Sequence, residues 1–161
     1  MSSIIKPPAN QRSLLYLRKM MIDDLPDVME GEIQSYSYPW TSGIFTSCLE
    51  GKRNSCWVLE LEKELKGHVV ISAAAGEAHI LNLCVYPEIQ GKGWGRKLLT
   101  EAEWIAKQHR AETCFLEVRP SNLAGMHLYQ DMGYNEIGVR KDYYPTHNGR
   151  EDALVMAKTL F

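Results

Sequence analysis

A glycine-rich turn near the middle of the chain separates two kinds of hydrophobic pattern. Before the turn, three runs of apolar and β-branched residues alternate with short polar segments, which predicts three antiparallel strands at residues 56–62, 65–74 and 78–85. After the turn, the apolar residues between Gly95 and Arg110 recur at helical spacing and predict a helix of about four turns. A chain that passes from strands through such a turn into an amphipathic helix is typical of a mixed α/β domain.

The rest of the chain supplies further elements around this central unit. The sequence predicts strands at residues 13–19, 113–118, 134–142 and 153–159, and helices at residues 23–34, 41–49 and 121–132. Ser121 is the expected cap of the last helix. A ten-residue loop, 143–152, joins the last two strands and contains the turn signal Asn148-Gly149. The predicted order is β-α-α-β-β-β-α-β-α-β-β, an α/β (α+β) fold with helices on the faces of a mixed sheet.

Length and charge limit the domain organisation and the partners. The 161 residues carry 18 Lys and Arg against 20 Asp and Glu, a net charge of −2, and suit one domain over residues 13–161 after a flexible tail over residues 1–12. This charge gives no broad electrostatic reason to bind nucleic acid or an anionic membrane surface. The sequence has no run of about 18 apolar residues and no signal-peptide segment. We therefore expect a cytoplasmic monomer that acts on a small molecule or a peptide.

The cysteines and histidines show no metal-binding pattern. Cys48, Cys56, Cys84 and Cys114 form no C-x-x-C pair, and a domain of this size needs no disulfide bonds, so we expect reduced and mostly buried thiols. The five histidines show no H-E-x-x-H or other i, i+4 pairing. The sequence predicts no metal site.

The glycine-rich turn, residues 90–96, could hold a phosphate group. Its alternating glycines allow a tight turn that brings backbone N–H groups close to a ligand at the start of the following helix, and Lys92 and Arg96 would add positive charge. The turn lacks the Ser or Thr of a Walker loop, and its G-x-G-x-G spacing differs from the dinucleotide-binding fingerprint. Spacing alone leaves a phosphate cradle and an ordinary turn equally open.

The pattern Gln90-x-x-Gly93-x-Gly95 resembles the acetyl-coenzyme A loop of the GCN5-related N-acetyltransferase (GNAT) superfamily. The resemblance continues from about Leu81 to Tyr134 as strand, loop, helix, strand, Asn-containing turn and a helix that ends in Leu-Tyr-x-x-x-Gly-Tyr. It implies a mostly antiparallel sheet of six to seven strands, helices on both faces, and a splay between the fourth and fifth strands.

Within the superfamily, the chain resembles the RimI group of bacterial ribosomal-protein alanine N-acetyltransferases over about residues 13–158. The segment Tyr143 to Ala153 carries most of this likeness, and Pro39-Trp40 with Phe45 matches the group's early helix. Gly125, inside the predicted helix 121–132, departs from the usual pattern because glycine is a poor helix former.

The resemblance implies acetyl-coenzyme A as the cosubstrate. Backbone groups of Leu83, Cys84 and Val85 would pair with the pantetheine arm, and Asn122 would reach the same arm from the following helix. The pyrophosphate would be held by Gly91, Lys92, Gly93, Trp94, Gly95 and Arg96.

Two residues match the catalytic acid and base of the family. Glu117 lies in an otherwise apolar strand and matches the general base, although a solvent-facing strand position would also explain it. Tyr129 matches the general acid, and a phenol with a pKa of about 10 is protonated at neutral pH as that role requires. Core packing would also explain an aromatic residue there.

The same likeness implies a peptide groove and a substrate. Trp40, Tyr143, Tyr144 and Arg150 would line the groove, and the acceptor would be the N-terminal alanine of ribosomal protein S18. An amine acetyltransferase of broader specificity on the same fold, and a non-catalytic module that binds coenzyme A, remain open alternatives.

Overall fold

The structure is a computed structural model and describes residues 4–5 and 16–161. The strands are β1 (Ile4–Ile5), β2 (Tyr16–Lys19), β3 (Asn54–Leu61), β4 (Glu64–Ala74), β5 (Glu77–Val85), β6 (Thr113–Val118), β7 (Asn135–Thr146) and β8 (Gly149–Thr159). The α-helices are α1 (Leu25–Ser35), α2 (Ser42–Glu50), α3 (Trp94–Gln108) and α4 (Leu123–Asp131). Most of the predicted tail and residues 13–15 of the predicted first strand lie outside the described residues. The two described residues of that tail, Ile4 and Ile5, pair with β2.

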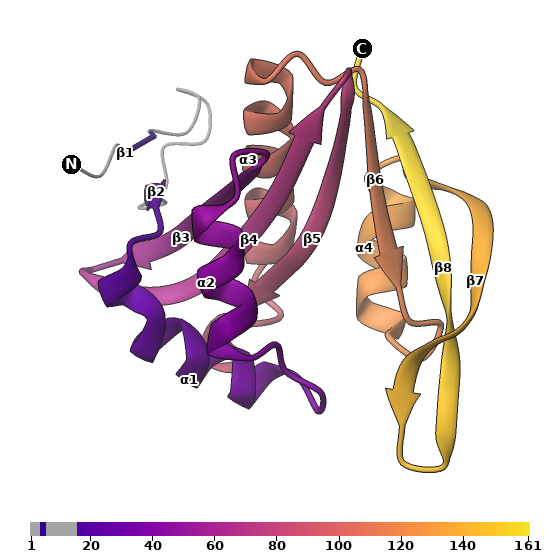
Figure 1. The fold of residues 1–161 in the computed structure, drawn as a ribbon, viewed down its shortest axis with the longest axis horizontal. Coiled ribbons are helices and arrows are strands. Elements are labelled where there is room, and N and C mark those ends of the chain that lie inside the picture. Colours follow the sequence, from indigo (N-terminus) through magenta and orange to yellow (C-terminus); the bar gives the residue numbers. More distant parts are fainter. Residues whose placement is uncertain (1–3, 6–15) are drawn as a thin grey trace.

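One twisted sheet runs through the molecule in the order β1-β2-β3-β4-β5-β6-β8-β7 (Figure 1). Apart from the two-residue β1, it has the six to seven strands expected. Every neighbouring pair is antiparallel except β5 with β6, which run parallel. Their pairing ends at Ile80 and Leu116, and beyond that point the two strands part. The mixed fold, with its splay between the predicted fourth and fifth strands, is therefore confirmed.

Helices cover both faces of the sheet and enclose two apolar clusters (Figure 1). Successive side chains of a strand point to opposite faces, so Val69 packs in the cluster under α3 while Val70 packs in the cluster under α1 and α2. Val28 of α1 and Phe45 of α2 are fully buried in the second cluster. The four cysteines are free and buried, as expected.

The last two strands form a long hairpin, so the predicted loop over residues 143–152 is wrong. β7 and β8 pair up to Thr146 and Gly149, which leaves a two-residue turn, His147-Asn148, one residue before the predicted turn signal Asn148-Gly149. Pro145 fits within this strand because β7 is the edge strand, where a proline removes no necessary hydrogen bond. A bulge between Arg140 and Tyr144 interrupts the register, with Asp142 at φ +52°.

The last helix starts differently from the prediction. Asn122, not Ser121, is the N-cap, and its side-chain oxygen accepts a hydrogen bond from the Gly125 N–H at 3.0 Å. A Cβ atom at Gly125 would lie 2.6 Å from the Asn122 side chain. The unusual glycine therefore makes room for the cap.

None of the helices in residues 16–161 combines the length and the apolar composition that a membrane crossing requires.

Gly31 provides a test of how tightly α1 packs against the sheet. A Cβ atom there would lie 2.1–2.4 Å from the ring of Tyr86, which is buried. We expect Gly31→Ala to lower the free energy of unfolding by about 1–3 kcal/mol, because the ring has no room to move. Gly43→Ala, on the exposed face of α2, is the matched control and should change stability by less than about 1 kcal/mol. Chemical denaturation of both variants measures the difference, and equal stabilities would contradict the packing described.

Candidate active site

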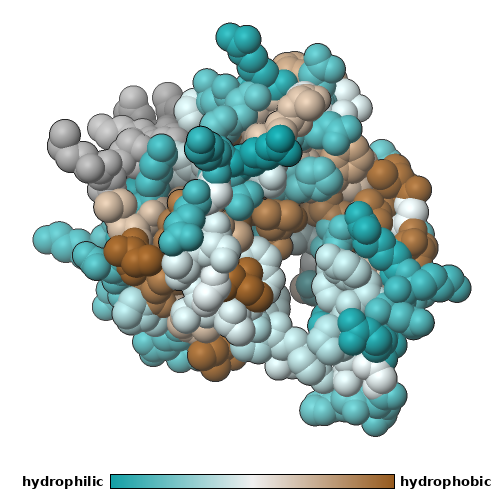
Figure 2. Space-filling model, in the orientation of Figure 1, coloured by the Kyte–Doolittle hydropathy of each residue, from teal (hydrophilic) through white to brown (hydrophobic). Residues whose placement is uncertain are grey.

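The parting of β5 from β6 opens a groove of about 620 Å³. Figure 2 shows a hollow between the body that carries α1 and α2 and the β7–β8 hairpin. One wall is the end of α1 with the loop that follows, and the other is the hairpin; β5, β6, the segment between β6 and α4, and Tyr129 of α4 supply the remaining lining. Six of the site residues predicted from the sequence line this groove: Trp40, Leu83, Glu117, Asn122, Tyr129 and Tyr144.

The open edge of β5 presents backbone groups to this groove. The Tyr86 N–H donates to the Lys66 carbonyl of β4 at 3.0 Å, so alternate residues up to Tyr86 face β4. Leu83 and Val85 therefore face the splay with both their N–H and C=O groups. No backbone acceptor for these two N–H groups occurs among the described residues. The side chain of Cys84 is buried on the α1 side of the strand.

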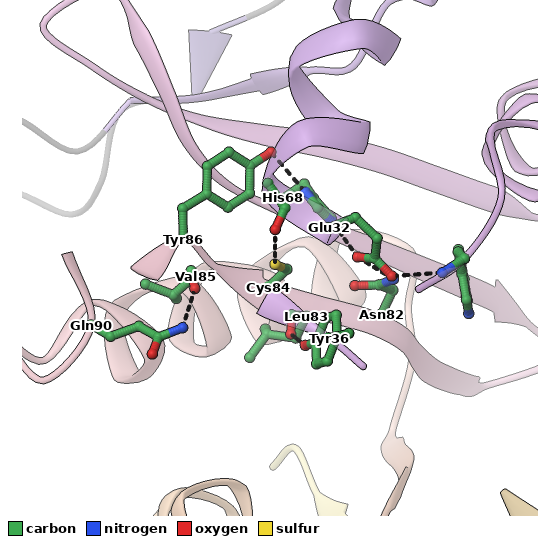
Figure 3. Close-up of polar contacts among 11 residues, drawn as sticks. Glu32, Tyr36, His68, Asn82, Leu83, Cys84, Val85, Tyr86 and Gln90 are labelled. Carbon is green, nitrogen blue, oxygen red and sulfur yellow. Dashed lines mark hydrogen bonds and ion pairs between the residues drawn. The ribbon is translucent and has the colours of Figure 1, made fainter. Parts of the chain in front are cut away.

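Two side chains already bind the carbonyls at this edge (Figure 3). The Tyr36 hydroxyl donates to the Leu83 carbonyl at 2.5 Å, and the Gln90 side-chain amide donates to the Val85 carbonyl at 2.7 Å. The edge therefore offers two unpaired donors beside two satisfied acceptors. Unpaired donors of this kind suit the carbonyl oxygens of an extended ligand.

The glycine-rich turn has the conformation that a phosphate cradle needs. Gly91 and Gly93 have φ angles of +77° and +87°, which side chains other than glycine rarely adopt, and Gly93 caps α3. In the described part of the chain, the backbone N–H groups from Gly91 to Arg96 have no backbone acceptor. Exposed Lys92 and the N-terminus of α3 add positive potential. These donors fit the pyrophosphate of acetyl-coenzyme A.

Several residues of the turn also join it to neighbouring elements. Arg96 forms an ion pair with Asp131 of α4, and the Lys97 ammonium lies 4.4 Å from the ring centroid of Trp94. A Cβ atom at Gly95 would lie 3.3 Å from Leu128 of α4, so this glycine lets the two helices approach closely.

Glu117 projects from β6 into the groove beside the hairpin. Its side chain is one quarter exposed, and its Oε1 atom forms an ion pair with Nε of Arg140 at 2.9 Å. Burial, together with the Glu117 carboxylate, raises the pKa of Tyr143 above its usual value. Burial also raises the pKa of Tyr144, and the negative charge of Glu117 adds to this rise. A carboxylate in such a position can accept a proton from a bound amine.

Tyr129 is both a core residue and a groove residue. It packs edge-on against Tyr134 with ring centroids 6.0 Å apart, and burial raises its pKa to about 12. Its phenol therefore stays protonated at neutral pH and can act as an acid.

The hairpin wall is held by Arg119. Its guanidinium lies 4.3 Å from the ring centroid of Tyr144 and 5.3 Å from that of Tyr38, and it donates to the Pro145 carbonyl at 2.8 Å. Glu151 pairs with the same arginine and accepts two hydrogen bonds from Ser121. These contacts join β6, the loop after α1 and the hairpin around the groove.

Arg150 lies at the bulge and is absent from the groove lining. It donates to the backbone carbonyls of Asp142 and Tyr143 at 2.7 and 3.2 Å, and the Asp142 N–H donates to Asp152 at 2.9 Å. In this structure the arginine holds the backbone conformation of the hairpin.

The sequence analysis missed a buried polar network at the floor of the groove (Figure 3). The Glu32 carboxylate, only 1% exposed, hydrogen-bonds His68 of β4 at 2.9 Å and accepts bonds from the Asn82 side chain and the Trp40 N–H. On its other side, the His68 ring contacts the Tyr86 hydroxyl at 3.0 Å. A buried charge is costly unless it is paired, and this one carboxylate joins α1, the loop after it and two strands. Single polar residues in apolar segments are the only sequence signal for it.

Cys84 lies close to this network. Glu32, His68 and Cys84 offer three atoms within 4.8 Å of one another that could ligate a metal. Glu32 and His68 already bind each other, and burial raises the pKa of the Cys84 thiol to about 12. Glu32 and His68 thus belong to a hydrogen-bonded network, and the neighbouring Cys84 thiol is protonated.

Comparison with known proteins identifies the family. The sequence model of the acetyltransferase (GNAT) family matches residues 20–134. The chain therefore belongs to this family. It is 35% identical over 134 residues to a [ribosomal protein bS18]-alanine N-acetyltransferase of Escherichia coli (strain K12), which covers 83% of this chain and 90% of that protein. The corresponding Haemophilus influenzae protein is 35% identical over 135 residues, covering 83% of this chain and 91% of its own.

The fold agrees with the sequence comparison. The crystal structure of the Escherichia coli ribosomal-protein-S18-alanine N-acetyltransferase superposes with a TM-score of 0.82 and 31% identity, covering 99% of this chain and 94% of its own. The predicted membership of the GNAT superfamily and the N-acetyltransferase class are thus confirmed, while the roles of individual residues stay predictions.

The phenol of Tyr129 provides a pH test of the site. Its raised pKa predicts that wild type and Tyr129→Phe give the same phenolate absorbance up to about pH 11. An unfolded tyrosine ionises near pH 10, so folding stability should fall as the pH rises from about 10 to about 12, and this group should add no pH dependence below that window. Spectrophotometric titration of the two proteins measures the difference. A phenolate signal from Tyr129 near pH 10 would contradict its burial.

Proposed function

We propose that this protein transfers an acetyl group from acetyl-coenzyme A to the α-amino group of the N-terminal alanine of ribosomal protein S18. The observation that carries the proposal is the convergence of Glu117, Tyr129 and the unpaired N–H groups of β5 on one groove. The substrate comes from the relatives that carry this activity in their names.

Acetyl-coenzyme A would supply an acetyl group activated as a thioester. The N–H groups of the glycine-rich turn, with Lys92 and Arg96, would hold its pyrophosphate. The N–H groups of Leu83 and Val85 would bind carbonyl oxygens of the arm, and one of them would polarise the thioester carbonyl. Asn122 lines the groove at the start of α4, where its amide nitrogen would reach the same arm.

Glu117 and Tyr129 would manage the protons of the reaction. Glu117 would take a proton from the acceptor ammonium, directly or through a water molecule, and leave a neutral nucleophile. Tyr129 would donate its phenol proton to the departing thiolate, since its phenol is protonated at neutral pH. The two groups come from β6 and from the helix that follows it, α4, and both line the groove.

The energetics favour an α-amine over a lysine. At pH 7, deprotonation costs about 1.4 kcal/mol for an α-amine of pKa near 8 and about 4.6 kcal/mol for a lysine of pKa near 10.4. A single carboxylate can meet the smaller cost more easily. The aromatic residues of the two walls, Trp40, Tyr38 and Tyr144, would hold the extended end of a peptide.

The substrate class can be tested with peptides. We expect a peptide that begins with the alanine of S18 to be acetylated at its α-amine, and the same peptide with a blocked N-terminus and one internal lysine to react at least tenfold more slowly, because of the energetic difference above. Mass spectrometry of the products locates the acetyl group. Exclusive acetylation of lysine or of small amines would favour the broader-specificity alternative.

The catalytic roles can be tested with two conservative variants. We expect Glu117→Gln and Tyr129→Phe each to lower kcat by about 10²- to 10⁴-fold, because each removes a proton-transfer group. Coenzyme A binding, measured by calorimetry, should stay within about threefold of wild type, since neither side chain belongs to the backbone donors. Glu136→Gln, on the exposed part of β7, is the matched control. Unchanged kinetics in both variants would remove the assigned roles and favour the non-catalytic alternative.

A further inference from the structure

The Glu117 carboxylate already has a positively charged partner. Arg140 reaches it from β7 with Nε 2.9 Å from Oε1, and the arginine side chain is 57% exposed at the rim of the groove. The guanidinium also lies 5.8 Å from the ring centroid of Tyr143. The bulge after Arg140 breaks the strand alternation and brings the tyrosine to the same carboxylate. Glu117, the proposed base, therefore has one carboxylate oxygen, Oε1, paired with the Arg140 guanidinium.

This pairing affects which form of an amine can bind at Glu117. An acceptor on the second carboxylate oxygen would lie a short distance from the guanidinium group. An ammonium group there would be repelled by the arginine, whereas a neutral amine would not. Because only the neutral amine can attack a carbonyl, the repulsion favours the reactive form.

We propose that Arg140 is a positioning residue that holds Glu117 and, by repelling the ammonium form, favours loss of the proton from the bound acceptor amine. This inference rests on the proposed function. Arg140 then has two effects that oppose each other in the overall rate. It weakens binding of the ammonium form, and it increases the reactive fraction of the bound amine.

The other charged groups around the pair do not provide the same effect. Arg119 is engaged by Glu151 and by the rings of Tyr38 and Tyr144. Tyr129, Tyr143 and Tyr144 have raised pKa values through burial and are neutral at pH 7. His147, at the hairpin turn, packs edge-on against Tyr38 at 6.3 Å. Among the described residues, Arg140 is the cation paired with Glu117.

The experiment compares Arg140→Gln, Arg140→Lys and the control Lys141→Gln, which removes the same charge from the adjacent exposed residue. With the S18 N-terminal peptide, Arg140→Gln should lower KM by up to about tenfold and lower kcat at pH 7 by about tenfold. Its kcat should recover at higher pH, with the rising limb of the pH profile shifted upward by about one unit. Arg140→Lys should restore the wild-type profile, and Lys141→Gln should match wild type.

Calorimetry supplies a readout that does not depend on turnover. The same peptide is titrated into enzyme saturated with coenzyme A, near pH 7, in buffers of different ionisation enthalpy. Wild type should release a proton as the amine binds, and Arg140→Gln should release less.

Unchanged proton release and an unchanged pH profile in Arg140→Gln, with Glu117→Gln still inactive, would overturn this inference and leave the proposed function intact. Failure of wild type to acetylate the peptide would overturn both. A loss of kcat that Arg140→Lys does not restore and higher pH does not reverse would show a purely structural role.

Discussion

The parting of β5 from β6 is the constraint on which the rest of the site depends. The two strands pair in parallel only as far as Ile80 and Leu116, and a register irregularity in β5 follows at once, where Val70 of β4 faces Asn82. A bulge at such a place ends regular pairing and redirects the strand. Beyond it, Leu83 and Val85 keep donors that no neighbouring strand uses. A sheet paired throughout would have neither these donors nor the groove.

The two walls of the groove are held by different kinds of interaction. The wall after α1 depends on the buried Glu32 carboxylate, which is hydrogen-bonded to His68, the Asn82 side chain and the Trp40 N–H. The hairpin wall depends on Arg119, which is partly exposed and combines ring contacts with an ion pair to Glu151. Removing a partner from a buried charge costs more than removing one at the surface. Loss of one contact should therefore destabilise the first wall more than the second.

Charge placement carries more functional information here than total charge does. The net charge of −2 is small, yet the chain sets Lys92 and the free N–H groups of the glycine-rich turn at one end of β5. At the groove it places Glu117 against Arg140. The turn suits a ligand rich in phosphate, and the ion pair suits an amine that must lose a proton. Both features rest on a few local charges that the overall balance conceals.

The sequence by itself determined the elements whose signals are local. The glycine-rich turn, the amphipathic α3 and strand β6 follow from neighbouring residues, because turn propensity and hydrophobic period act within a few positions. The likeness to a known family then pointed to Glu117 and Tyr129. Only the tertiary structure decided which groups meet from distant positions: Glu32 with His68, 36 residues apart, and Arg140 with Glu117 across the intervening strand β8. It also replaced the predicted loop 143–152 with a hairpin, since residues 144–146 pair with residues 149–151 of the neighbouring strand. Burial, strand position and pairing between distant residues arise only when the chain has folded, and they set the surroundings of each catalytic candidate.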